Sequence, residues 1–168
     1  TDYRGGSRQL ASGLSGTFWM SCLMRMASEG AYSWVGLTDS DPGHSLLEDA
    51  VGFSGNGTAI SLSFHDHSVS SGATSFTAGN IQNFTNNTTY LLLMKVTVNG
   101  SGATDSLKAW AFDSGDTIAT SEAGLGNPPL EIPFLDWGDA PDRFFTGGVA
   151  SSGNSTAFNM DAIRIAQR

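Results

Sequence analysis

The side chains of this sequence that are best suited to binding chemistry are aromatic rings in segments that also carry cations and a histidine. Apolar residues alternate in four such segments, and the positions between them carry these groups: Trp19, Arg25, His65, Lys95, Lys108, Trp110 and Phe112. A sugar ring stacks its apolar CH faces on aromatic rings while its hydroxyls bond to polar neighbours. If the four segments lie in one sheet, the sequence predicts a carbohydrate-binding surface. The alternative is that Trp19 and Trp110 are covered by another layer or loop and belong to the core.

A second candidate site is the segment Leu135–Arg143, which concentrates acidic, aromatic and glycine residues. Trp137 could stack on a sugar while Asp136 or Asp139 accepts hydrogen bonds from its hydroxyls, so that the segment forms the rim of a binding site. The same carboxylates could bind calcium, which prefers oxygen ligands. The third possibility is a loop that Trp137 anchors in the core.

The acidic residues show no pairing suited to glycoside hydrolysis. The four glutamates are scattered along the chain: Glu29, Glu48, Glu122 and Glu131. None lies in a predicted strand with a carboxylate two or four positions away, whereas a retaining glycosidase needs two carboxylates about 5 to 5.5 Å apart. Glu48 and Asp49 are adjacent, so they would point to opposite faces of an extended strand. The sequence therefore favours a protein that is not an enzyme, and an enzyme with a non-standard site stays open as the alternative.

The histidines offer one further possibility. His65 and His67 would share one face of a strand and could together hold a transition metal or take part in catalysis. A metal site normally needs a third ligand, and His44 is the only other histidine. The alternative is a plain strand end that leads into the serine-rich turn Ser68–Gly72.

Strands must position these groups, because apolar residues alternate with period two between clusters of Gly, Ser, Asn and Asp. At least seven strands are predicted: Thr17–Met26, Ser33–Thr38, Thr58–His65, Thr89–Val98, Ser106–Phe112, Phe144–Val149 and Ala157–Ala166. The pattern indicates an all-β sandwich that forms a single domain over residues 1–168. We expect Thr1–Ser12 to be a polar lead-in. We expect Thr120–Pro141 to be a loop that crosses the sandwich, since prolines are excluded from central strands.

Composition limits the partners of this chain. Its 168 residues carry a net charge of −8, which argues against nucleic acid and anionic membrane surfaces, because both need clustered Lys and Arg. No apolar stretch approaches the roughly 18 residues that would span a bilayer, so no membrane insertion is expected. Cys22 lies in an apolar run and is predicted to pack in the core. The polar start of the chain is compatible with a module of a longer parent protein that carries other domains.

Four segments resemble strands of the concanavalin A-like (LamG-type) jelly-roll superfamily, particularly modules of secreted bacterial multidomain proteins: Phe18–Arg25, Thr89–Val96, Asp105–Trp110 and Phe158–Ile165. The resemblance covers most of the chain from Thr17 onward. It implies two antiparallel sheets, one of them concave, and many relatives bind glycans on that concave face. The Glu-x-Asp-x-x-Glu motif that retaining enzymes of the superfamily carry is absent from this sequence.

The closing segment Met160–Ile165 resembles the last-strand motif Asp-x-Val/Ile-Arg-Val of laminarinase-like glycoside hydrolases and related modules. In those proteins the aspartate often helps to bind a structural calcium ion. The resemblance therefore implies Asp161 as a ligand of one structural calcium. The alternative is a carboxylate that pairs with a nearby arginine or caps a turn.

Together these observations predict a non-catalytic, extracellular or cell-surface module that binds a polysaccharide on the concave face or with an edge loop. The predicted binding residues are Trp19, Arg25, His65, Lys95, Lys108, Trp110, Asp136 and Trp137. Two alternatives remain. One is a structural or adhesive spacer domain of a surface protein, and the other is a glycan-cleaving hydrolase or lyase.

Overall fold

The computed structural model describes residues 2–11, 13–26, 32–38, 50–56, 59–66, 74–99, 105–135, 141–150 and 158–167. These residues form strands joined by loops, with one short 3-10 helix. The elements in chain order are β1 (Asp2–Gln9), β2 (Gly16–Met26), β3 (Tyr32–Thr38), β4 (Ala50–Asn56), β5 (Ala59–Asp66), β6 (Thr74–Asn83), β7 (Thr89–Val98), β8 (Asp105–Phe112), η1 (Glu122–Leu125), β9 (Leu130–Leu135), β10 (Arg143–Ala150) and β11 (Phe158–Gln167).

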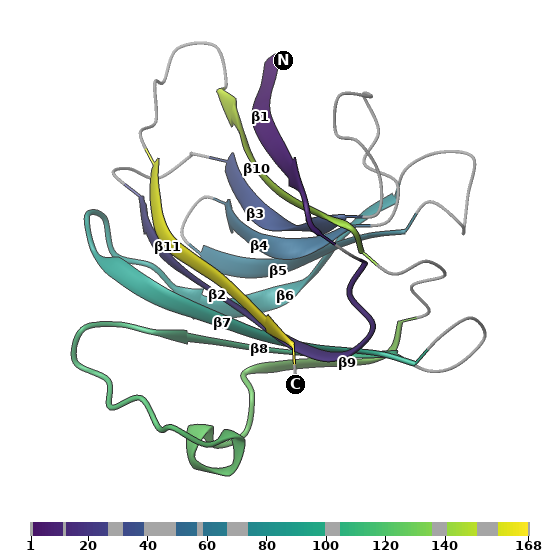
Figure 1. Cartoon of the computed structure of the whole chain (residues 1–168). Coiled ribbons are helices and arrows are strands. Elements are labelled where there is room, and N and C mark those ends of the chain that lie inside the picture. The colour runs from purple at the N-terminus through teal and green to yellow at the C-terminus, as the bar shows by residue number, and fades with distance from the viewer. Residues whose placement is uncertain are drawn as a thin grey trace.

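The strands pair into two antiparallel sheets. One sheet has the order β1-β10-β3-β4-β5-β6, and the other has the order β11-β2-β7-β8-β9. In Figure 1 both sheets bend in the same direction, and the first lies on the inner side of the bend. We therefore call the first the concave sheet and the second the convex sheet. The predicted all-β sandwich of two antiparallel sheets is confirmed.

The core lies between the sheets, as the alternation of apolar residues predicts. Every second residue of β2 and β7 is buried. The large side chains that are fully buried come from both sheets: Phe18, Met20, Met24, Leu92, Met94 and Leu107 from the convex sheet, and Val35, Leu37, Phe53, Ile60 and Leu62 from the concave sheet. Burial of such a side chain contributes about 1.5 to 3 kcal/mol. The apolar faces therefore determine how the two sheets pack.

Cys22 takes the core position predicted for it. Its side chain is fully buried among the apolar residues of this layer. Desolvation by burial raises the pKa of Cys22 to about 12. The thiol is therefore protonated at physiological pH and serves as a small apolar group.

Four strands were not among the predicted ones: β1, β4, β6 and β9. The expected lead-in Thr1–Ser12 is wrong, because β1 pairs along its length with β10. The expected loop Thr120–Pro141 is also wrong in part, because it contains η1 and β9. The strand β9 lies at the edge of the convex sheet, where Pro133 is tolerated because one side of an edge strand needs no hydrogen-bond donors. Within the described ranges, no helix is long and apolar enough to cross a membrane.

Candidate functional site

Two of the predicted binding residues form an aromatic pair on the outer face of the convex sheet. The rings of Trp19 in β2 and Trp110 in β8 are stacked, with centroids 5.8 Å apart and an angle of 23° between their planes. Trp110 is only 2% exposed, and Trp19 is partly buried. The indole Nε1 of Trp110 is buried and has no hydrogen-bond acceptor among the described residues. The pair is therefore packed under other atoms, and the ring of Trp110 is not presented to solvent.

The two predicted lysines on this face are paired with glutamates. Lys95 Nζ donates hydrogen bonds of 2.7 and 2.9 Å to the two carboxylate oxygens of Glu122, and it lies 5.8 Å from the centre of the Trp19 ring. Lys108 Nζ lies 3.7 Å from Glu122 and 3.6 Å from Glu131. The hydrogen bond from Lys95 is the main cause that lowers the pKa of Glu122 below its usual value. Both lysines thus have anionic partners within the protein.

Glu122 lies in η1, which belongs to the connection between β8 and β9. Figure 1 shows this connection on the outer side of the convex sheet. The carboxylate reaches Lys95 in β7, which is on the far side of β8 from β9, so the connection folds back across the sheet. Ser121 Oγ caps η1 by accepting a hydrogen bond of 3.3 Å from the amide of Gly124. Of the two interpretations left open by the sequence, the geometry favours a loop-covered, structural role for Trp110.

Two other predicted residues lie apart from this cluster. Arg25 is exposed at the end of β2, where its Nε donates to the carbonyl oxygen of Asn87 at 3.0 Å. This bond and a second one to Asn87 Oδ1 at 3.4 Å secure the turn that precedes β7. His65 lies in β5 of the concave sheet. The expectation that His65 shares one sheet with the tryptophans is therefore wrong, because the strand order separates β5 from β2, β7 and β8.

The remaining predicted loop residues and histidines cannot be placed. Asp136, Trp137 and Asp139 lie outside the described residues, as do His44 and His67. Their proposed contributions to a binding-site rim or a metal site stay predictions.

Asp161, the predicted calcium ligand, is exposed in β11. Its Oδ1 accepts a hydrogen bond of 2.7 Å from the amide of Ala162, the next residue. Ala162 has a φ of 53° and lies in a bulge where β11 pairs irregularly with β2. Asp161 thus stabilises a local backbone turn, which is the alternative role given above. The described part of the chain holds no group of three His, Cys, Asp or Glu side chains that could bind a metal, so calcium at Asp161 stays a prediction.

The concave sheet has a polar outer face, built by the residues between the core positions of its strands. Facing residues of antiparallel strands share one side of the sheet, so the register defines rows across it. One row contains Trp34, Ser54, Ser61 and Asn80. A second row contains Arg143, Thr38, Ala50, His65 and Ser75. Since Val35, Leu37, Val51 and Phe53 belong to the core, both rows belong to the outer, concave face.

Between these two rows the concave face has a floor of bare backbone. Gly36 in β3 faces Gly52 in β4, and the row continues to Phe145 on one side and Ser63 on the other. A Cβ atom added to Gly36 would lie 2.1 Å from the carbonyl oxygen of Val51, so only glycine fits. Gly36, Gly52 and Phe145 are all buried, so this row is packed and not open to solvent.

Hydrogen bonds join some of the polar groups beside this floor. Ser61 Oγ donates to Asn80 Oδ1 at 2.9 Å, and Asn80 is exposed. An amide that accepts one such bond keeps its NH2 donors for a ligand.

Trp34 and Arg143 were not among the predicted binding residues, although the register places both on this face. A signal for Trp34 was present, because the predicted strand Ser33–Thr38 alternates around Val35 and Leu37. Arg143 directly precedes the predicted strand Phe144–Val149. The order of the strands, which places Arg143 and His65 in one row, depends on long-range pairing that no local pattern encodes.

No protein-family model matches the chain, and no curated protein is similar to it in sequence. The chain is similar in fold to a glucuronan lyase and to a galectin. The endo-β-1,4-glucuronan lyase from the fungus Trichoderma reesei has a TM-score of 0.65 and 9% identity, over 99% of this chain and 74% of that chain. A tetrameric galectin from the ball sponge Cinachyrella sp. has a TM-score of 0.53 and 10% identity, over 96% of this chain and 98% of that chain. At these identities the likeness shows the fold alone, and it confirms the jelly-roll β-sandwich.

Proposed function

We propose that this protein binds a polysaccharide on the outer face of the concave sheet. The observation that carries the proposal is the exposed amide of Asn80, which lies in the polar row that also contains Trp34. The convex sheet is a weaker candidate, because its two predicted lysines are paired with glutamates.

The chemistry of this face suits a sugar chain. The exposed amide of Asn80 keeps NH2 donors that can bond to sugar hydroxyls. The row of Trp34 adds an aromatic residue to the face, and aromatic rings stack on the apolar side of a sugar.

The two similar structures support the proposal as well. One is named as an enzyme that acts on the polysaccharide glucuronan, and the other is a galectin. A shared fold does not by itself transfer a function, so the surface of this chain has to be tested directly.

A glycan-cleaving lyase is the second candidate. The fold match with the glucuronan lyase covers nearly the whole chain, and His65 shares a register row with Arg143. A histidine can accept a proton from a sugar ring, and an arginine can pair with the carboxylate of a uronic acid. The strands of these two residues are separated by β3 and β4, so an extended chain, and not one sugar unit, would contact both.

We further propose that the protein acts outside the cell, as a LamG-type module of a secreted bacterial protein, and that one calcium ion supports the fold near Asp161. These two points rest on the sequence resemblance described above.

The decisive experiment is a binding panel. The pure protein is incubated with glucuronan, a neutral β-glucan and a galactan, each with calcium and with chelator, and both retention and released products are measured. Variants on the concave face, Trp34→Ala and Asn80→Ala, are compared with Arg25→Gln, an exposed change on the convex sheet.

We expect retention on at least one polysaccharide without released products, and loss of retention in the concave-face variants only. Unsaturated products that disappear in His65→Ala would identify the lyase. Retention that Arg25→Gln abolishes and Trp34→Ala leaves intact would refute the concave site. Absence of both retention and products would favour a structural or adhesive spacer.

A further inference from the structure

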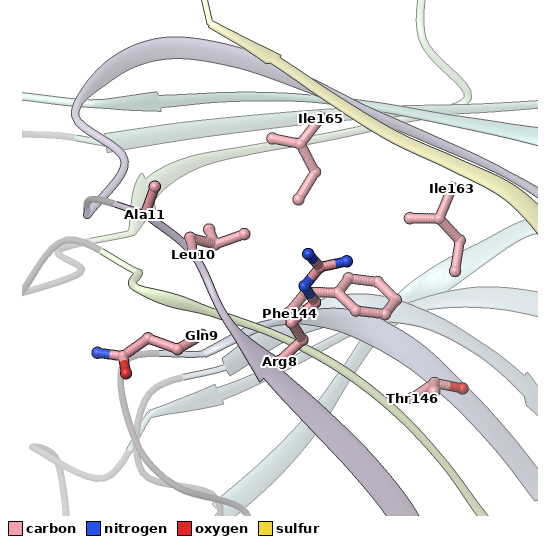
Figure 2. A pocket seen from close by; sticks show the side chains of 8 residues that line it. All are labelled: Arg8, Gln9, Leu10, Ala11, Phe144, Thr146, Ile163 and Ile165. Atoms are coloured by element: carbon pink, nitrogen blue, oxygen red, sulfur yellow. The ribbon is translucent and has the colours of Figure 1, made fainter.

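An apolar cleft opens between the two sheets at the edge where β1 and β11 are the outermost strands (Figure 2). Its volume is about 560 Å³, which is within the range of about 300 to 1,000 Å³ that small-molecule sites occupy. Its walls include Leu10 after β1, Phe144 of β10, and Ile163 and Ile165 of β11. The cleft is on a different side of the concave sheet from the proposed polysaccharide surface.

The cleft continues the hydrophobic layer between the sheets. Phe144 faces Leu37 in the register, and Thr146 faces Val35, and both of these partners are buried core residues. Phe144 is only partly buried. A hydrogen bond of 3.5 Å from Thr146 Oγ1 to Met160 Sδ joins the two sheets beside the cleft. The core layer therefore ends in a space that the described side chains line without filling.

A bulge in β11 directs apolar side chains into this space. Asp161 faces Leu23 and Arg164 faces Ser21, so one more residue lies between the pairs on β11 than on β2. The extra residue reverses the alternation, and Ile163 and Ile165 both point into the cleft in Figure 2. Ala162 has a φ of 53°, a left-handed conformation that costs a non-glycine residue free energy. Ile163 nevertheless remains 37% exposed, because nothing in the described structure covers it.

One cation extends into the apolar cleft. Arg8 faces Phe144 in the register, so it occupies the end of a row that otherwise faces the core. Figure 2 shows its guanidinium group beside the Phe144 ring, near Leu10 and Ile163. Arg8 has no ion pair or hydrogen bond with any residue that the structure describes, although the whole chain carries a net charge of −8. Arg8 is exposed, so its guanidinium group is accessible to a ligand in the cleft.

We propose that this cleft binds an amphipathic carboxylate, an acyl chain of medium length whose carboxylate pairs with Arg8 and whose tail lies against Phe144, Ile163 and Ile165. A guanidinium group matches a carboxylate with two parallel hydrogen bonds. The mainly apolar walls disfavour a free sugar, whose hydroxyls would lose hydrogen bonds with water against Phe144, Ile163 and Ile165. An amphipathic cation would be repelled by Arg8. The proposal does not depend on the polysaccharide site.

The test is a calorimetric titration with sodium decanoate below its micelle concentration. We expect one saturable site per chain. The affinity should rise by up to roughly tenfold for each two methylenes added from octanoate to dodecanoate. Decyltrimethylammonium, which has the same tail and the opposite head charge, should bind at least tenfold more weakly. Decyl phosphate tests whether the cleft prefers a carboxylate head group. Tighter binding of decyl phosphate than of decanoate would overturn the assignment of the head group as a carboxylate.

Two pairs of matched variants locate the site. Arg8→Gln should weaken decanoate binding at least tenfold, whereas Arg164→Gln, an exposed arginine of β11 that faces Ser21, should not. Ile163→Ser should weaken binding for every ligand with a long tail, whereas Ile118→Ser, at a 45% exposed isoleucine elsewhere, should not. All four residues are exposed, so the variants should keep the melting temperature of the original protein.

Absence of saturable decanoate binding would overturn the proposal. Equal binding of decanoate and decyltrimethylammonium would do the same, because it would show that Arg8 has no part. Equal effects of Ile163→Ser and Ile118→Ser would show that the tail lies outside the cleft.

Discussion

Substitution of Trp110 tests whether this residue stabilises the fold or contacts a polysaccharide. Trp110 is 2% exposed and stacks on Trp19 at 5.8 Å under the connection that carries η1. Truncation of a buried tryptophan to alanine costs about 3 to 5 kcal/mol, because packing is lost and a cavity remains. In a protein of this size, 1 kcal/mol shifts the melting temperature by about 2 to 4 °C. Trp110→Ala should therefore lower it by about 6 to 20 °C.

Trp110→Phe provides the matched control. The Nε1 group of Trp110 is buried without an acceptor among the described residues, and an unsatisfied buried donor costs about 1 to 3 kcal/mol. Phenylalanine removes this donor while it keeps an aromatic ring over Trp19. The relief offsets part of the lost packing, so we expect Trp110→Phe to change stability by less than about 1.5 kcal/mol.

The assay is urea denaturation followed by circular dichroism, with the slope of the transition checked for each variant. Polysaccharide retention is measured on the folded proteins at a temperature where both variants are more than nine-tenths native. A loss below about 1 kcal/mol in Trp110→Ala would refute the assignment of this ring to the protein interior. Loss of retention in a fully folded Trp110→Phe would return the binding site to the convex sheet.

Three further predictions follow from single contacts. Glu122→Gln should destabilise by less than about 1 kcal/mol at neutral pH, since the pair with Lys95 is partly exposed. The pKa of Glu122 is lowered on folding, so the ionised carboxylate stabilises the folded protein at a pH above its usual pKa of 4.5. This stabilisation should be lost as the pH falls below 4.5 and the carboxylate is protonated. Urea denaturation of the original protein and of Glu122→Gln between pH 7 and 3 measures the loss. Cys22, with a pKa of about 12 and no exposure, should resist alkylation at pH 8 in the native protein and react fully in urea. Gly36→Ala should destabilise by about 1 to 3 kcal/mol, because its Cβ would clash with the backbone of Val51; an unchanged urea midpoint would contradict the close approach of β3 and β4.

Local pattern was enough to predict the sandwich and most of its core. Phe18, Met20 and Met24 alternate along β2, and a strand has only two faces, so burial of one face follows from sequence alone. The same rule identified the outer positions of β7 and β8. It failed for β1, whose polar sequence contains no alternation and which is held by the backbone hydrogen bonds of β10.

The sequence by itself determined the fold class, the acidic charge and the core role of Cys22, because each depends on composition or on neighbours along the chain. Only the tertiary structure decided that Trp110 is covered, that His65 and Arg143 share one register row of the concave sheet, and that Arg8 lines an apolar cleft. These placements come from strand order and from a connection that folds back over the sheet. Such contacts join residues that are far apart in the chain, and their energies depend on the whole packed assembly, so no local spacing reveals them.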